Sequence, residues 1–175
     1  SGNNYLVSFA DNSTGAITIR SITVTAVSVN KVYDGNNNSA GVPTITTGTL
    51  ATGDTAPWTQ SFDNKNAANG KTLTPSGAIN DGNGGTNYNV TVATALGNIT
   101  PTDLNVTANN KIIIFGGTDP VFDFTVSGFV SPDAFLTTPT CSVTNPHTAA
   151  GTYPIICSGG DAGTNYTIHY YYGVF

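Results

Sequence analysis

A short pattern of residues that occurs three times constrains this chain more than any other feature of its sequence. Each copy begins with Asn-Tyr and continues with β-branched and aromatic residues; the copies are 4–9, 87–92 and 165–170. A glycine follows each copy after a few residues: Gly15, Gly97 and Gly173. Self-similarity of this kind is typical of repeated structural units. We therefore expect the chain to consist of successive copies of one module.

The first two copies stay similar beyond their glycines, since residues 17–26 correspond to residues 99–108. One unit is therefore about 80 residues long, and its last strand continues into the first strand of the next unit. Thr100 and Pro101 mark the join, because proline removes a ladder donor and favours extended backbone before it. Such units are expected to stand end to end as a stiff rod. The expected divisions are the terminal strands of a preceding unit, one whole unit and a second unit, at residues 1–20, 21–101 and 102–175.

Within the units, apolar residues alternate with polar ones, as in 22–27 and 104–108. This period is typical of strands with one buried face, and further strands are expected, among them 88–93 and 111–115. The chain has no glutamate and only 9% charged residues, so residues that favour helices are scarce, whereas Thr, Val, Ile and Tyr favour strands. We predict a mainly β fold of two small tandem domains, each a small β-sandwich or a β-grasp-like sheet. At most one short helix is expected, at 131–136, with Ser131 as its cap and Pro132 in its first turn.

The charge of the chain and the length of its apolar runs exclude two classes of partner. The formal net charge is −5, with five Lys and Arg residues that form no cluster. A surface that follows nucleic-acid phosphates needs a basic patch, so no nucleic-acid partner is expected. No apolar run approaches the roughly 20 residues of a membrane helix, so no direct membrane insertion is expected. Nothing at the N-terminus resembles a signal peptide.

The two cysteines, Cys141 and Cys157, both fall in predicted strands of the second unit. An even number of cysteines in a polar chain of exported character favours a disulfide. Free buried thiols are the first alternative. A metal site that includes His147 or His169 is the second, but the sequence has no C-x-x-C pair, and zinc ligands are usually more closely spaced.

Several ordered motifs of the first unit resemble the YDG domain of bacterial surface proteins. They include the signature Tyr33-Asp34-Gly35, together with 48–50, Gly53-Asp54, 62–66, 70–74 and 86–88. The second unit resembles an MBG-type domain, through 115–120, 124–129, 151–159 and 165–168. It departs from that pattern at Phe115, where a tyrosine is usual, at Gly117, where an aspartate is usual, and in the isoleucine run 112–114.

The resemblance implies a function as well as a fold. Such domains occur in tandem in large exported bacterial proteins of the fibrillar adhesin and haemagglutinin kind. It implies non-catalytic stalk or spacer repeats at the bacterial cell surface or outside the cell, which project a distal binding region and contact neighbouring repeats. The alternative is an adhesive module that itself binds a glycan or a host or partner protein.

Residues that could carry catalysis are few. His147 and His169 are the only side chains with an unperturbed pKa near neutrality, and we interpret them as a turn residue and an outward-facing strand residue. No enzyme activity is expected. Asp81, Asp119 and Asp123 are weak candidates for calcium ligands, because hard oxygen ligands in loops suit this ion. Turn formation explains the same aspartates, so no cofactor is expected.

Two aromatic groups are candidates for contact with a ligand or with a neighbouring domain. They are Trp58 and the run Tyr170, Tyr171 and Tyr172. Exposed rings of this kind stack on sugars or pack against another domain. The lysines Lys31, Lys65 and Lys71 are expected to lie exposed along sheet edges, where charge discourages pairing with other strands.

Overall fold

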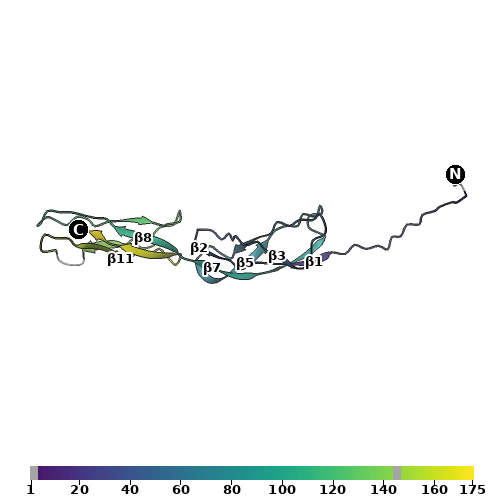
Figure 1. Cartoon of the computed structure of the whole chain (residues 1–175), viewed down its shortest axis with the longest axis horizontal. Helices are drawn as coiled ribbons and strands as arrows, with labels where there is room; N and C mark the ends of the chain where they lie inside the picture. Colours follow the sequence, from purple (N-terminus) through teal and green to yellow (C-terminus); the bar gives the residue numbers. More distant parts are fainter. Residues whose placement is uncertain (1–3, 144–146) are drawn as a thin grey trace.

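The computed structural model describes residues 4–143 and 147–175. This part of the chain is all-β, and two units follow one another along the long axis (Figure 1). It contains no helix that could cross a lipid bilayer. The strands are β1 (Arg20–Thr25), β2 (Asn30–Val32), β3 (Thr44–Thr47), β4 (Thr59–Phe62), β5 (Ala68–Ser76), β6 (Tyr88–Ala93), β7 (Ala95–Thr100), β8 (Thr102–Ala108), β9 (Phe124–Ser127), β10 (Thr140–Val143), β11 (Pro154–Ser158), β12 (Tyr166–Tyr171) and β13 (Gly173–Val174).

Each unit is built from two small sheets. In the first unit, β1 lies between β3 and β6, and a second sheet has the order β2-β7-β5-β4. In the second unit, β8 lies between β12 and β9, and β11 lies between β10 and β13. The mainly β, two-domain prediction is confirmed.

In each unit the first strand runs beside a strand near the end of the unit, and the two run in the same direction. In the first unit β1 pairs with β6 in parallel over its whole length, from Arg20 opposite Tyr88 to Thr25 opposite Ala93. The pairing continues as β2 against β7. In the second unit β8 pairs with β12 in the same way, beginning with Thr102 opposite Tyr166. The repeated Asn-Tyr pattern of the two units therefore marks the strand that pairs in parallel with the first strand of its unit.

The predicted alternation is visible in the burial of these strands. Ile22 and Val24 of β1 are at most 1% exposed, while the residues between them lie nearer the surface. Leu104 and Val106 of β8 are fully buried in the same manner. Burying aliphatic side chains of this size stabilises a fold by about 1.5–3 kcal/mol each.

Buried side chains form three clusters in the described residues. One lies in the first unit around Ile22 and Tyr88, and another lies in the second unit around Val106 and Ile155. The third joins the units, since Tyr33 and Ile99 of the first pack with Tyr166 of the second. The two units therefore share buried side chains where they meet.

The structure corrects three expectations about local conformation. Residues 131–136 form a turn and not a helix, because the N–H groups of Leu136 and Thr137 donate to the Asp161 carbonyl across the unit. Residues 111–115, an expected strand, belong to no strand. Lys71 is buried at 5% exposure, because Asp63 and Asn64 supply oxygen partners for its ammonium group at 2.7 and 2.6 Å.

Residues 4–19 precede the first unit as an extended segment without strand pairing (Figure 1). Residues 1–3 of the expected terminal strands lie outside the described residues. The large apolar side chains of the segment are exposed, among them Leu6, Phe9 and Ile17.

Candidate functional site

Polar side chains of both units meet where the two units contact each other. β7 ends at Thr100 and β8 begins at Thr102, so Pro101 alone connects the units. We call the contact the interdomain junction and define it by the residues that meet there: Tyr33, Ala67, Val130, Asp133, Asn165 and Tyr166.

One carboxylate at the junction accepts hydrogen bonds from both units. The hydroxyls of Tyr33 and Tyr166 each donate to Oδ2 of Asp133 at 2.7 Å. The Tyr166 hydroxyl also accepts the backbone N–H of Val130 at 3.1 Å. Tyr33 and Tyr166 are 3% and 8% exposed, so water has little access to either ring. Hydrogen bonds to a charged acceptor are stronger than those between neutral groups, so Asp133 ties the first unit to the second.

The pKa values of these groups determine which of them donate and which accept at neutral pH. The hydroxyl bonds from Tyr166 and Tyr33 lower the pKa of the Asp133 carboxyl, which therefore stays ionised. Burial, followed by the bond to Asp133, raises the pKa of Tyr166 to about 12. The same two causes, in the same order, raise the pKa of Tyr33. Both phenols therefore stay protonated and donate.

Packing and a second set of polar contacts surround this carboxylate. The rings of Tyr33 and Tyr166 meet edge to face with their centroids 5.6 Å apart. Such pairs contribute about 0.5–1.5 kcal/mol beyond their buried area. Asn165 accepts the backbone N–H of Ala67 at 2.8 Å and donates to the Asn66 side chain at 3.3 Å. The junction thus combines a shared apolar core with hydrogen bonds on both sides.

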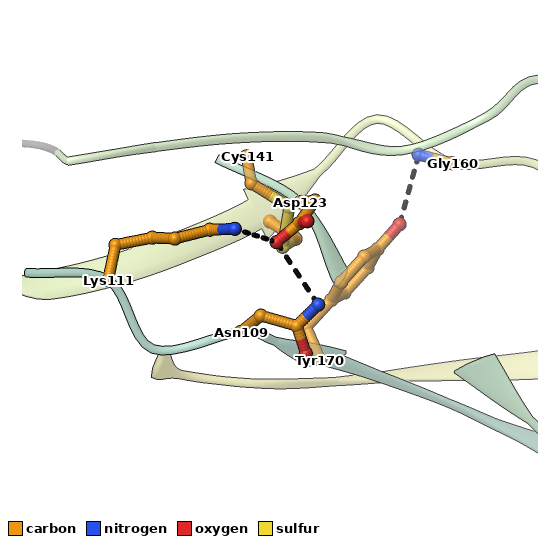
Figure 2. Close-up of a disulfide and its surroundings, with 7 residues drawn as sticks. Asn109, Lys111, Asp123, Cys141, Gly160 and Tyr170 are labelled. Atoms are coloured by element: carbon orange, nitrogen blue, oxygen red, sulfur yellow. Dashed lines mark hydrogen bonds and ion pairs between the residues drawn. A yellow bond between two sulfur atoms is a disulfide. The ribbon is translucent and has the colours of Figure 1, made fainter. Parts of the chain in front are cut away.

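The candidate aromatic residues lie away from the junction. Trp58 packs against the cluster around Ile22, and Tyr170 packs in the cluster of the second unit, where its hydroxyl accepts the N–H of Gly160 (Figure 2). Tyr171 and Tyr172 are 52% and 69% exposed. Of the four, these two are therefore the most accessible to a ligand.

Cys141 and Cys157 are joined by a disulfide across the ladder between β10 and β11 (Figure 2). They face each other directly in that antiparallel pair, so the bond cross-links two strands of the smaller sheet of the second unit. Nearby, Asp123 accepts Lys111 at 2.8 Å and Asn109 at 3.1 Å. The bonds from Lys111 and then Asn109 lower the pKa of Asp123.

The other calcium candidates also have protein partners. Asp81 accepts backbone N–H groups within its own turn, including those of Asn83 and Gly85, both at 2.8 Å. Backbone donors, Gly85 first, lower the pKa of Asp81. Asp119 contacts the His147 ring at 2.8 Å. In the described ranges no three His, Cys, Asp or Glu side chains gather as a metal site would require.

Sequence reasoning missed the junction residues. Tyr33 belongs to the Tyr-Asp-Gly signature and Tyr166 to the repeated Asn-Tyr pattern, so both residues stood within recognised motifs. Their meeting with Asp133 was not foreseen, because Tyr33 and Asp133 are 100 residues apart. A weak signal was present in the sequence, since an aspartate follows a glycine by five or six residues in both units, from Gly48 to Asp54 and from Gly128 to Asp133.

Two β units with parallel terminal strands, joined by a single residue and a shared core, define a tandem β-repeat protein. Comparison with known families agrees: residues 18–95 match the YDG domain, and residues 104–175 match the MBG domain of the YGX type. The chain therefore contains a YDG domain followed by an MBG domain. Domains of these families are associated with adhesin-like or repeat proteins. No curated protein and no solved structure matches the chain.

Proposed function

We propose that the YDG and MBG domains serve as non-catalytic spacer repeats of a bacterial cell-surface or secreted adhesin. In this role they act outside the cell and contact neighbouring repeats of the same chain. Their work is mechanical: they hold a distal binding region away from the cell. The proposal needs no cofactor.

The interdomain junction is the observation that supports this proposal. A spacer must keep its domains aligned, and the Asp133 carboxylate binds one tyrosine from each domain at 2.7 Å. The shared cluster around Tyr33, Ile99 and Tyr166 adds apolar burial to the same contact. Independent domains on a flexible linker would bury little surface between them, whereas a rigid spacer requires such a contact.

Small-angle X-ray scattering of the whole chain tests the proposal. We expect a rod-like distance distribution that fits one fixed arrangement of the two domains. The double variant Tyr33→Phe with Asp133→Ala should broaden that distribution, while Asp54→Ala, at the far end of the YDG domain, should leave it unchanged. Scattering from the unmodified chain that requires many domain orientations would contradict a spacer role.

The exposed pair Tyr171 and Tyr172 favours a second candidate function. Two accessible phenol rings, Tyr171 at the end of β12 and Tyr172 directly after it, suit stacking on a sugar or contact with a partner protein, as in an adhesive module. A glycan array probed with the intact chain tests this. Binding that Tyr171→Ala removes, while Tyr5→Ala does not, would support the adhesive function over the spacer function.

A further inference from the structure

At the interdomain junction the MBG domain contributes Val130, Asp133 and Tyr166. The outer end of the YDG domain, where β1 begins, contains the same arrangement of hydrogen bonds. The backbone N–H of Ala51 donates to the Tyr88 hydroxyl at 2.8 Å, and this hydroxyl donates in turn to the Asp54 carboxylate. The backbone N–H of Asp54 also donates to the carbonyl of Ala51. The same three bonds occur in the MBG domain, among Val130, Asp133 and Tyr166.

A further pair of residues extends this equivalence. The backbone carbonyl of Asn87 accepts the N–H that begins β1, and that of Asn165 accepts the N–H that begins β8, at 2.9 and 3.0 Å. In the MBG domain the Asn165 side chain then accepts the main chain of Ala67 from the YDG domain. We call Ala51, Asp54, Asn87 and Tyr88 the outer face of the YDG domain.

The outer face lacks the partners that its counterpart has. Asp133 accepts a second hydroxyl, from Tyr33 of the other domain, whereas in the described residues Asp54 accepts only that of Tyr88. Asn87 is exposed while Asn165 is half-buried, and the Asn87 side-chain oxygen accepts the Asn83 amide of its own turn at 3.2 Å, which leaves room for a second donor. The outer face therefore has the donors and acceptors of the MBG half of the junction, but among the described residues no second domain contacts them.

The segment before the outer face carries the matching part of a domain. Residues 4–19 resemble the sequence of β6 and β7, the last two strands of the YDG domain, with Asn4-Tyr5, Gly15 and Ile17-Thr18 in the places of Asn87-Tyr88, Gly97 and Ile99-Thr100. Tyr5 and Ile17 are 85% and 102% exposed, whereas their counterparts Tyr88 and Ile99 are 8% and 1% exposed. Side chains that a domain buries are here in solvent, so the segment has the pattern of strands whose domain lies on the N-terminal side.

We infer that the outer face binds the end of a preceding YDG-type domain, to which residues 4–19 contribute the last two strands. In this contact the tyrosine of the preceding Tyr-Asp-Gly turn donates its hydroxyl to Asp54. A backbone N–H of that domain donates to the Asn87 side chain, as Ala67 does to Asn165. The inference rests on the proposed spacer function and adds the identity of the neighbour.

The chemistry selects a neighbour with a tyrosine in this turn, as in the YDG domain, over one with a phenylalanine there, as in the MBG domain of this chain. The turn of the MBG domain that corresponds to Tyr33 carries Phe115, which has no hydroxyl to donate and is 66% exposed. A carboxylate at a domain contact requires a hydrogen-bond donor, since a charge that is buried without one is unfavourable. Asp54 therefore fits the end of a domain with a Tyr-Asp-Gly turn and not that of a domain with a phenylalanine at the position of Phe115.

A chain with residues 19–100 duplicated in tandem tests the inference. In it Thr100 of the first copy precedes Ile19 of the second copy, which preserves the natural Thr-Ile sequence of residues 18–19. We expect Tyr33 of the first copy to meet Asp54 of the second. In a double-mutant cycle of Tyr33→Phe in the first copy and Asp54→Asn in the second, the unfolding equilibrium should deviate from additivity by at least about threefold.

The duplicated chain contains its own controls. The reciprocal cycle, with Tyr33→Phe in the second copy and Asp54→Asn in the first, joins groups that cannot meet and should be additive. Tyr33→Phe in the second copy with Asp133→Asn calibrates the coupling of the junction described above. Additivity in the first cycle together with coupling at the calibrating junction would overturn the inference while leaving the spacer function in place.

Scattering from the unmutated duplicated chain provides a second measurement, which does not depend on the folding of variants. We expect one rod in which both junctions are fixed. A distribution that requires free rotation between the two copies, but not between the second copy and the MBG domain, would also overturn the inference. Free rotation at both places would instead contradict the spacer function.

Discussion

Removing the Asp133 carboxylate is the most direct test of how the two domains are held together. Asp133→Ala leaves two phenol hydroxyls, those of Tyr33 and Tyr166, without their acceptor. A buried polar group that loses its partner costs about 1–3 kcal/mol. Both rings are less than a tenth exposed, but Asp133 itself is half-buried and water can enter in its place. We therefore expect a loss of about 3 kcal/mol in the free energy of unfolding.

Asp54→Ala is the matched control, because Asp54 occupies the same position in the YDG domain and accepts only the Tyr88 hydroxyl among the described residues. Its expected loss is about half as large, roughly 1.5 kcal/mol. Urea unfolding, followed by tryptophan fluorescence and far-ultraviolet circular dichroism, gives both values when the denaturant slopes agree.

The difference between the two variants measures the contribution of Tyr33 across the junction. In the Asp133→Ala background, Tyr33→Phe should cost little more, since its acceptor is already gone. Equal losses for Asp133→Ala and Asp54→Ala, or a full additional loss from Tyr33→Phe, would refute the argument that one carboxylate ties the domains together.

Three further predictions concern pH, redox state and packing. The tyrosine donors lower the pKa of Asp133 in the folded state. The stabilisation from this carboxylate is therefore complete above the unfolded pKa of about 3.9 and is lost as the pH falls through the lower folded pKa. The free energy of unfolding, measured against pH in the acid range, should fall less steeply for Asp133→Asn than for the unmodified chain. Reducing the Cys141–Cys157 disulfide should destabilise the MBG domain by about 3 kcal/mol, since it closes a loop with a sequence separation of 16; a Ser pair at both positions should match the reduced chain in calorimetry, and an unchanged transition would contradict this. Gly97→Ala should cost about 1–3 kcal/mol, because its methyl would overlap the Val29 carbonyl, whereas Gly15→Ala, with nothing within 4 Å, should be neutral in the same urea assay.

The repeat predicted the strands that depend on local pattern. Residues 88–93, expected as a strand from their alternation, form β6 with the same limits. In contrast, 111–115 was also expected as a strand, yet it belongs to none, and Ile112 and Ile114 are about nine-tenths exposed. An apolar run becomes a strand only where a neighbouring strand is available to pair with it, and periodicity does not encode the neighbour.

The candidate site was less predictable, because its residues meet only through tertiary structure. Asp133 was expected in a helical turn, but its turn opens so that the carboxylate reaches Tyr33 and Tyr166. Lys71 was expected at an exposed sheet edge, yet it is buried because Asp63 and Asn64 approach it from the preceding turn. Composition predicts how many charges a chain has, but their burial depends on which loops fold over them.

The parallel pairing of terminal strands determines how tension would pass through this molecule. Force enters the YDG domain at the start of β1 and leaves at the end of β7, and the stretch β1–β2 lies beside β6–β7 in the same direction. Tension along the rod therefore slides two strands past each other and loads their ladder of hydrogen bonds all at once. Hairpins, which are pulled open one bond at a time, do not share load in this way. Because β7 continues through Pro101 into β8, the same tension acts on the MBG domain, where it shears β8 against its parallel partner β12.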